Sequence, residues 1–173
     1  VLVFTAMFTA YTYLAEILEQ VAGVPAAQVG WWLMGFGVVG MLGNSLAGRI
    51  VDRSPLGATV LLLVILATGM GAVAPVVGNP ALLLIALALW GVAYTALFPV
   101  CQVRVMQAGA KAQALAGTLN VSAAHGGIAV GAALGGLVIQ WYGTAALGYV
   151  ASAVAGLAVL ATLLLMAGAR PRA

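Results

Sequence analysis

Six long apolar stretches run through the sequence, separated by short breaks in which charged residues, glycine and proline gather. Soluble domains carry about 25% charged residues, whereas this 173-residue chain has 5% charged and 65% hydrophobic residues. A helix crosses a bilayer with about 20 apolar residues, while membrane barrel strands are shorter and alternate in polarity. We therefore predict an all-α membrane protein with six transmembrane helices. Their predicted spans are 1–21, 28–50, 58–77, 80–105, 113–140 and 144–168.

The positions of the basic residues predict an orientation for these spans. If the six spans cross the membrane in alternating directions, all six basic residues fall on the same side of it: Arg49, Arg53, Arg104, Lys111, Arg170 and Arg172. Cytoplasmic loops of membrane proteins carry an excess of lysine and arginine. We therefore expect this side, and both ends of the segment, to face the cytoplasm from the plasma (inner) membrane. Four aromatic residues fall at the opposite breaks and are predicted to form an interfacial belt: Trp31, Trp32, Trp141 and Tyr142.

Polar residues are distributed over the spans in a pattern that occurs twice. The first, second, fourth and fifth spans carry several polar side chains, while the third and sixth carry few. Helices that line an aqueous path need such residues, and inverted three-helix repeats are common in secondary transporters. We predict one six-helix bundle, 1–173, built from two inverted three-helix repeats, 1–77 and 78–173. The tripeptide Ala-Tyr-Thr occurs once in each repeat, at 10–12 and at 93–95.

Small residues at four-residue spacing predict two ridges for close helix packing in lipid. One ridge is Gly127, Gly131 and Gly135, and the other is Gly35, Val39, Gly43 and Ala47. The alternative interpretation is a surface on which helices slide during transport.

The stretch GFGVVGMLGNSLAGRIVDR resembles the second helix in the C-terminal half of a major facilitator superfamily transporter, running into the cytoplasmic gate motif. That motif is a glycine followed four residues later by Asp-Arg, and Gly48, Asp52 and Arg53 match it. The stretches AYTYLAEILEQVAGV and SAAHGGIAVGAALGGLVI resemble the first helix and the glycine-rich fifth helix of the same half. The likeness covers essentially the whole chain. It is closest to the bacterial drug:proton antiporter and arabinose-type efflux permease group.

The chain departs from the family pattern at three places. Ser54 and Pro55 follow the motif, where its stronger form continues with glycine and further basic residues. His125 stands where the family usually has asparagine, and Glu16 stands where a proline is expected.

The resemblance implies a secondary transporter that works by alternating access. We expect efflux of small drugs, sugars or similar metabolites by proton antiport. The expected partners are a small-molecule substrate, the lipid bilayer and the missing N-terminal six-helix half. The alternative is a passive channel or a structural six-helix membrane bundle without coupled transport.

Other classes of function fit the residues poorly. The basic residues form no patch with interleaved aromatics, so no nucleic-acid partner is expected. An intramembrane enzyme needs paired catalytic groups, and His125 is the only titratable residue near the centre of a span. Cys101 is the single cysteine and cannot build a metal cluster with others. We therefore expect no enzyme activity, no metal and no cofactor.

Eight polar or aromatic residues in the spans are candidates for the substrate path. They are Tyr11, Tyr13, Glu16, Asn44, Trp90, Tyr94, Asn120 and His125. The aromatic members are expected to line a cavity for apolar or sugar-like ligands. A carboxylate such as Glu16 is costly in a membrane unless it faces a cavity, whereas Glu19 is expected at the interface. His125 is either a substrate contact that titrates or a neutral histidine that is hydrogen-bonded across helices.

Four residues form the candidate cytoplasmic gate motif: Gly48, Arg49, Asp52 and Arg53. The basic members anchor this loop on the cytoplasmic side. Asp52 can also pair with a nearby arginine and accept hydrogen bonds from the N-terminus of a neighbouring helix. The resemblance implies that this contact is a latch, which holds the cytoplasmic side shut in one transport state.

Overall fold

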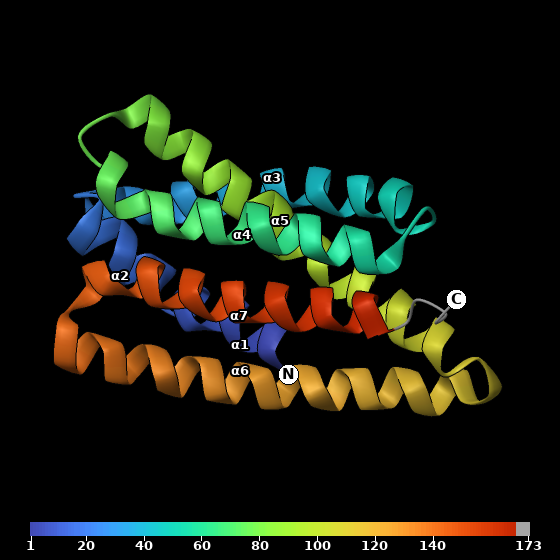
Figure 1. Ribbon diagram of the computed structural model, residues 1–173. Helices are drawn as coiled ribbons and strands as arrows, with labels where there is room; N and C mark the ends of the chain where they lie inside the picture. Colours follow the sequence, from blue (N-terminus) through green and yellow to red (C-terminus); the bar gives the residue numbers. More distant parts are fainter. Residues whose placement is uncertain (169–173) are drawn as a thin grey trace.

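Helices make up nearly all of residues 1–168, the part of the chain that this computed structural model describes (Figure 1). Within those residues there is no strand, and five helices are long and apolar enough to cross a membrane. They are α3 (Ala26–Val51), α4 (Pro55–Val76), α5 (Pro80–Ala108), α6 (Gln113–Tyr142) and α7 (Leu147–Gly168). Short 3₁₀ turns, η2 (Ala110–Ala112) and η3 (Thr144–Ala146), precede the last two. The predicted all-α membrane fold is confirmed.

The first predicted span, 1–21, is not one continuous helix. It consists of α1 (Leu2–Tyr11), α2 (Leu14–Glu16) and the π-helix η1 (Ile17–Val21). It also accompanies only part of the bundle, because a Cβ atom on Gly127, midway along α6, would lie 2.9 Å from the carbonyl oxygen of Val1. Residues 1–21 are therefore helical, as predicted, but they do not form one continuous helix.

The hydrogen bonding of the first segment changes at Thr12 and Tyr13, where α1 ends. The hydroxyl of Thr12 donates to the carbonyl of Phe8 at 2.7 Å, so it competes with the backbone amide of Thr12, which lies 3.4 Å from the same oxygen. Such back-bonding bends helices. The next amide, that of Tyr13, donates to Ala10, three residues back instead of four. Apolar length predicts a span but does not register these local bonds.

Two of the long helices begin at a polar cap followed by proline. Ser54 precedes α4, and its Oγ accepts from the amide of Gly57 at 3.1 Å. Asn79 precedes α5, and its Oδ1 accepts from the amides of Ala81 and Leu82. Proline at the first helical position lacks an amide hydrogen that would have no partner inside the helix. These caps fix the two turns that separate α4 from its sequence neighbours.

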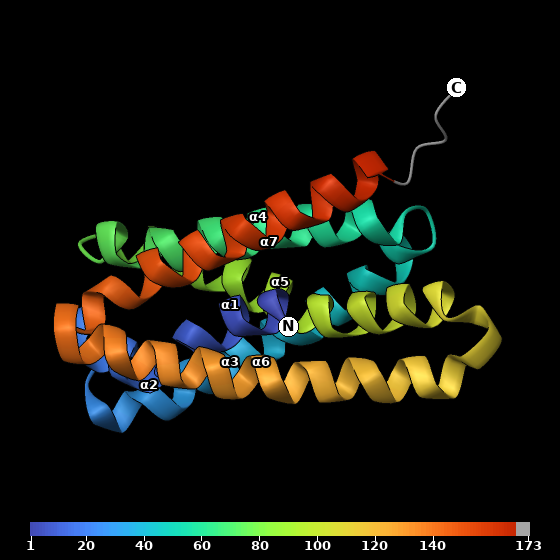
Figure 2. The ribbon, with the colours of Figure 1, turned by 60° about the horizontal axis from the view of Figure 1, so that its bottom comes forward.

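The helices pack in pairs that reflect the predicted repeats. α4 packs extensively against α5 and α7, α3 against α5, and α1 against α6 and α7 (Figures 1 and 2). Exchanging the first three spans with the last three maps the α1–α6 pair onto the α5–α3 pair and leaves the α4–α7 pair unchanged. The division of the chain after residue 77 stays a prediction.

The glycine ridge of α6 is a packing surface for α1. A Cβ atom on Gly131 would lie 2.7 Å from the carbonyl oxygen of Thr5, and one on Gly127 would lie 2.5 Å from the Cβ of Phe4. Gly135 faces Thr9 and the ring of Tyr13 in the same way. Backbones approach this closely only where one partner has no side chain.

The prediction of the second ridge is correct only for its last two residues, Gly43 and Ala47. Gly43 and Ala47 are buried, and Gly43 abuts the backbone of Val92 in α5. Gly35, by contrast, has no neighbouring atom within 4 Å of where its Cβ would be. The buried positions are Phe36, Gly40, Gly43 and Ala47. A straight helix has 3.6 residues per turn, so the residues on its contact face are spaced alternately four and three residues apart. A strict four-residue spacing therefore drifts off that face.

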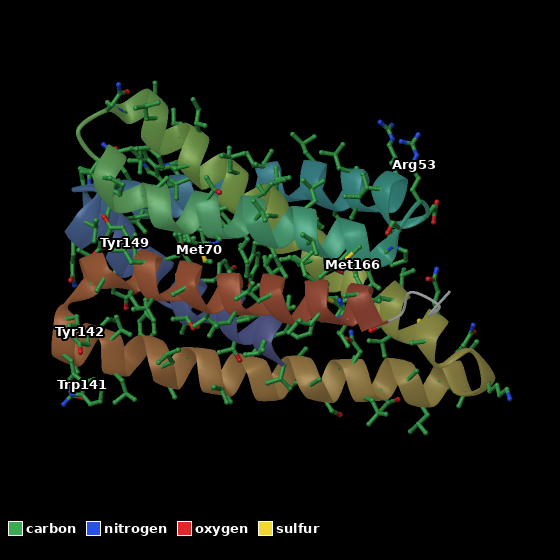
Figure 3. The ribbon with its side chains drawn as sticks, viewed as in Figure 1. Arg53, Met70, Trp141, Tyr142, Tyr149 and Met166 are labelled. Atoms are coloured by element: carbon green, nitrogen blue, oxygen red, sulfur yellow. The ribbon has the colours of Figure 1, made fainter. Side chains whose placement is uncertain are left out.

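The turns between helices alternate between two ends of the bundle, as Figures 1 and 2 show. Arg53 and Met166 lie toward one end, here termed the inner end, and Trp141 and Tyr142 lie at the other, the outer end (Figure 3). The cytoplasmic sidedness of the inner end stays a prediction. Arg170 and Arg172, which contributed to it, lie outside the described residues.

Candidate functional site

A groove of about 470 Å³ opens between α1, α3 and α5. Aromatic rings from two of these helices line it, including Phe8, Tyr94 and Phe98. Asn44 and Thr95 bring polar groups to an otherwise apolar wall. No charged residue is among the described residues that line the groove. Such a surface suits a small molecule that is mainly apolar and forms a few hydrogen bonds.

Two stacked tyrosines stand beside this groove. The rings of Tyr11 and Tyr94 lie with centroids 4.1 Å apart at an interplanar angle of 23°. The rings of Phe8 and Phe36 flank Tyr94 at 5.7 and 6.1 Å. Tyr11 and Tyr94 are the central residues of the two Ala-Tyr-Thr tripeptides. The short internal repeat therefore places equivalent residues of the two predicted repeats face to face.

Thr95 fixes α3 against α5 at the back of the groove. Its hydroxyl donates to the carbonyl of Gly40 at 2.6 Å and lies 3.1 Å from the carbonyl of Gly91 in its own helix. The adjacent Tyr94 is held in place by this contact between helices. Asn44, one turn further along α3, is exposed at the groove. Tyr94 and Asn44 are thus the two sequence-predicted candidates that line the groove itself.

The structure places Trp90 in the core instead of on the groove. The side chain is fully buried, and its ring meets that of Phe36 edge to face at a centroid distance of 5.6 Å. Its indole Nε1 is buried and has no hydrogen-bond partner among residues 1–168. An aromatic residue at mid-span looks the same in sequence whether it faces a cavity or a neighbouring helix.

Tyr13 and Glu16 lie at the broken first segment, away from the groove. The hydroxyl of Tyr13 donates to the carbonyl of Ala132 in α6 at 2.8 Å. Glu16 ends α2 and is half-buried. Nearby, the hydroxyl of Thr144 donates to the side chain of Gln20 at 2.7 Å and ties the π-helix to the outer end. Tyr13 and Gln20 thus join the first segment to other elements, and neither they nor Glu16 line the groove.

Asn120 and His125 share α6 but have different surroundings. Asn120 is buried, and its Nδ2 donates to the Oε1 of Gln102 in α5 at 2.7 Å. His125 is exposed, and its Nδ1 lies 2.8 Å from the carbonyl of Val121 in the same helix. The predicted bond across helices is therefore made by Asn120 instead of His125.

The gate motif spans the last turn of α3 and the start of the turn to α4, at the inner end. Gly48, Arg49, Asp52 and Arg53 are all exposed, and Figure 3 shows Arg53 extending from the turn. Asp52 is the C-terminal cap of α3. Ser54 caps the N-terminus of α4. Asp52 therefore does not accept hydrogen bonds from that N-terminus. Among the described residues there is no cluster of three metal-ligating side chains.

Sequence reasoning missed most of the residues that line the groove. Phe8, Phe98 and Met41 line the groove, yet nothing in the sequence separates them from apolar residues that face lipid. Thr95 carried a usable signal, because it closes the second Ala-Tyr-Thr tripeptide.

Known proteins resemble this chain over most of its length. The family model of the Major Facilitator Superfamily matches residues 1–173. The chain is 37% identical over 160 residues to the inner membrane transport protein YdhP of Escherichia coli O157:H7, covering 90% of the chain and 40% of that relative. It is 34% identical over 148 residues to the chloramphenicol efflux pump Rv0191 of Mycobacterium tuberculosis, covering 79% of the chain and 35% of that relative. A probable sugar efflux transporter of Mannheimia succiniciproducens is 29% identical over 160 residues, covering 92% of the chain and 40% of that relative. The chain thus spans about 40% of the length of YdhP.

Proposed function

Because the chain belongs to the Major Facilitator Superfamily, we propose that it is the C-terminal half of a transporter that exports small molecules across the inner membrane. Transport proceeds by alternating access, with a second six-helix half rocking against this one around a site between them. Proton antiport supplies the energy. The names of the relatives, which include efflux proteins for chloramphenicol and for sugars, support export.

Exposed apolar surface supports a second half. Large apolar side chains of α3 stand open on the side of that helix that carries the groove residue Met41. They are Met34, Val38, Met41 and Leu42. Lipid covers such residues as well as protein does, but the groove beside them carries polar groups that lipid does not satisfy. A second helical half that closes over this face satisfies both requirements.

The single observation that carries the proposal is the tyrosine pair beside the groove. Secondary transporters bind substrate near the midplane, where their repeats meet, and Tyr11 and Tyr94 meet between the two predicted repeats. Tyr94 and Asn44 both line the groove, so an aromatic ring and an amide are available there. We propose that the substrate stacks near Tyr94 and hydrogen-bonds to Asn44. Asp52 and its neighbouring arginines then latch the inner end against the second half, since α4 is already capped.

Transport by the complete transporter in proteoliposomes tests this proposal. Replacing Tyr94 with leucine should weaken substrate binding by up to about tenfold, because an aromatic contact contributes about 0.5–1.5 kcal/mol beyond its buried area. Tyr149→Leu is the matched control, since Tyr149 is exposed on α7. Equal loss in both variants would remove Tyr94 from the substrate path. A proton gradient should drive efflux against the substrate gradient, whereas a passive channel only equilibrates the substrate.

A further inference from the structure

We propose that a second groove, at the inner end between α4, α5 and α7, binds the phosphate of an anionic phospholipid through Arg104. This groove measures about 440 Å³. Residues from all three helices line it, among them Ser54, Leu56, Arg104, Val105 and Leu165. It shares no lining residue with the groove beside Tyr94. A lipid site here is therefore separate from the proposed substrate path.

Arg104 is held at the groove by one weak contact. Its Nη1 lies 3.4 Å from the Oγ1 of Thr59, whose own hydroxyl donates to the carbonyl of Pro55 at 2.8 Å. Thr59 is fully buried, while Arg104 is half-buried. A guanidinium has five N–H donors, and Thr59 accepts from one of them. The contact thus orients the guanidinium and leaves donors for a ligand.

The charge of Arg104 calls for an anion that the lining does not supply. No acidic residue is among the described residues of this groove. The chain has three acidic residues, of which Glu16 and Glu19 belong to the broken first segment and Asp52 is exposed in the α3–α4 turn. A guanidinium matches the geometry of phosphate oxygens well. Charge complementarity therefore favours a phosphate group at Arg104.

The apolar part of the lining selects a lipid over a free phosphate ion. Pro55, Leu56, Val105 and Leu165 stand beside Arg104 in one groove, and the side chain of Leu165 is 61% exposed. An amphiphile satisfies both surfaces, with its phosphate at the arginine and its acyl chains along the apolar residues. Basic pockets between transmembrane helices on the cytoplasmic side bind anionic lipid headgroups. A lipid such as phosphatidylglycerol has the required chemistry.

Native mass spectrometry of the purified complete transporter tests the site. The parent should retain phosphatidylglycerol in preference to phosphatidylcholine. Arg104→Gln should lower phosphatidylglycerol retention about fivefold, the contribution of one basic residue near a membrane surface, and Arg104→Lys should retain most of it. Lys111→Gln is the matched control, because Lys111 is exposed at the same end and is not in the groove. Unchanged retention in Arg104→Gln, or an equal loss in Lys111→Gln, overturns the proposal.

A second pair of variants keeps the test decisive if Arg104→Gln fails to fold. Leu165→Glu places a negative charge in the groove and should repel phosphatidylglycerol. Leu164→Glu places the same charge one residue away, at a position that is 74% exposed and does not line the groove. Equal retention by these two variants counts against the site. Displacement of the lipid by inorganic phosphate alone would show that the acyl chains contribute nothing, and this also overturns the proposal.

Discussion

At the scale of single residues, several polar side chains in this bundle join segments that are far apart in the sequence. Asn120 reaches Gln102, Tyr13 reaches Ala132, and Thr95 reaches Gly40. The first and third of these bonds connect two packed helices, and that of Tyr13 connects the break in the first segment to α6. The residues that sequence reasoning marked as polar therefore divide into those that fasten the scaffold and those, such as Asn44, that stand open at the groove.

The Asn120–Gln102 contact allows a direct energetic test. Hydrogen bonds between helices in membrane proteins contribute about 0.6 kcal/mol on average. A double-mutant cycle of Asn120→Ala and Gln102→Ala, measured by unfolding of the complete transporter, should give a coupling energy of about this size. The control cycle pairs Gln102→Ala with Ser122→Ala. Ser122 is exposed on α6, the helix of Asn120, so this cycle should give no coupling energy. Additive effects of the Asn120 and Gln102 changes would show that the contact contributes nothing to stability.

Tyr13 is expected to stabilise the break in the first segment. Tyr13→Phe removes only the hydroxyl that donates to Ala132 at 2.8 Å, so it should lower the free energy of unfolding by about 1 kcal/mol. Tyr142→Phe removes a hydroxyl from a side chain that is 73% exposed and should leave stability unchanged. Thermal denaturation in detergent compares the two. A melting temperature of Tyr13→Phe that equals the parent's would mean that water replaces the lost bond.

At the scale of helices, apolar length and local backbone chemistry have different predictive reach. Runs of about 20 apolar residues locate α3 to α7 well, since bilayer thickness sets their length. The same reasoning made residues 1–21 one span, because the hydrogen bonds of Thr12 and Tyr13 leave no mark on hydropathy. The sequence predicted only some of the residues that line the groove, for a related reason. Tyr94 and Trp90 lie four residues apart on α5, yet only the first faces the groove, and the packing of α3 decides which.

Close contact between α1 and α6 should depend on particular glycines. In Gly131→Ala the new Cβ would lie 2.7 Å from the carbonyl oxygen of Thr5, and overpacking of this kind costs about 1–3 kcal/mol. Gly126 is on the same helix with no neighbouring atom within 4 Å of its Cβ position. Gly126→Ala should therefore be neutral or slightly stabilising, because alanine favours helix more than glycine does. Thermal stability and transport of both variants check this, and equal damage in both would contradict the packing described here.

At the scale of the whole molecule, the turns alternate between the inner and outer ends of the bundle. Reagents added on opposite sides of the membrane should therefore label different turns. Single cysteines at Ser54 and Lys111 should react only with a reagent in the cytoplasm, and those at Asn79 and Gly143 only with one outside. The native Cys101 is buried, so background labelling should be low. A single position that reacts from the wrong side would contradict the topology.

The open groove also predicts how the 173 residues behave alone. Expressed as given, the chain should insert into the membrane but not transport, because one wall of its substrate path is missing. Co-expression of the proposed N-terminal half should restore transport. Saturable uptake by the isolated chain would show that the groove works without a second half.

The stacking of Tyr11 on Tyr94 has an evolutionary consequence. Each ring occupies space that the other would otherwise fill, with centroids 4.1 Å apart, so the two positions are exposed to selection as a single unit. Residues in contact tend to covary. When related sequences are aligned, a larger side chain at one position should accompany a smaller one at the other, even though the two positions lie in different predicted repeats. A substitution that is harmful at either position alone would then be tolerated once its counterpart had changed.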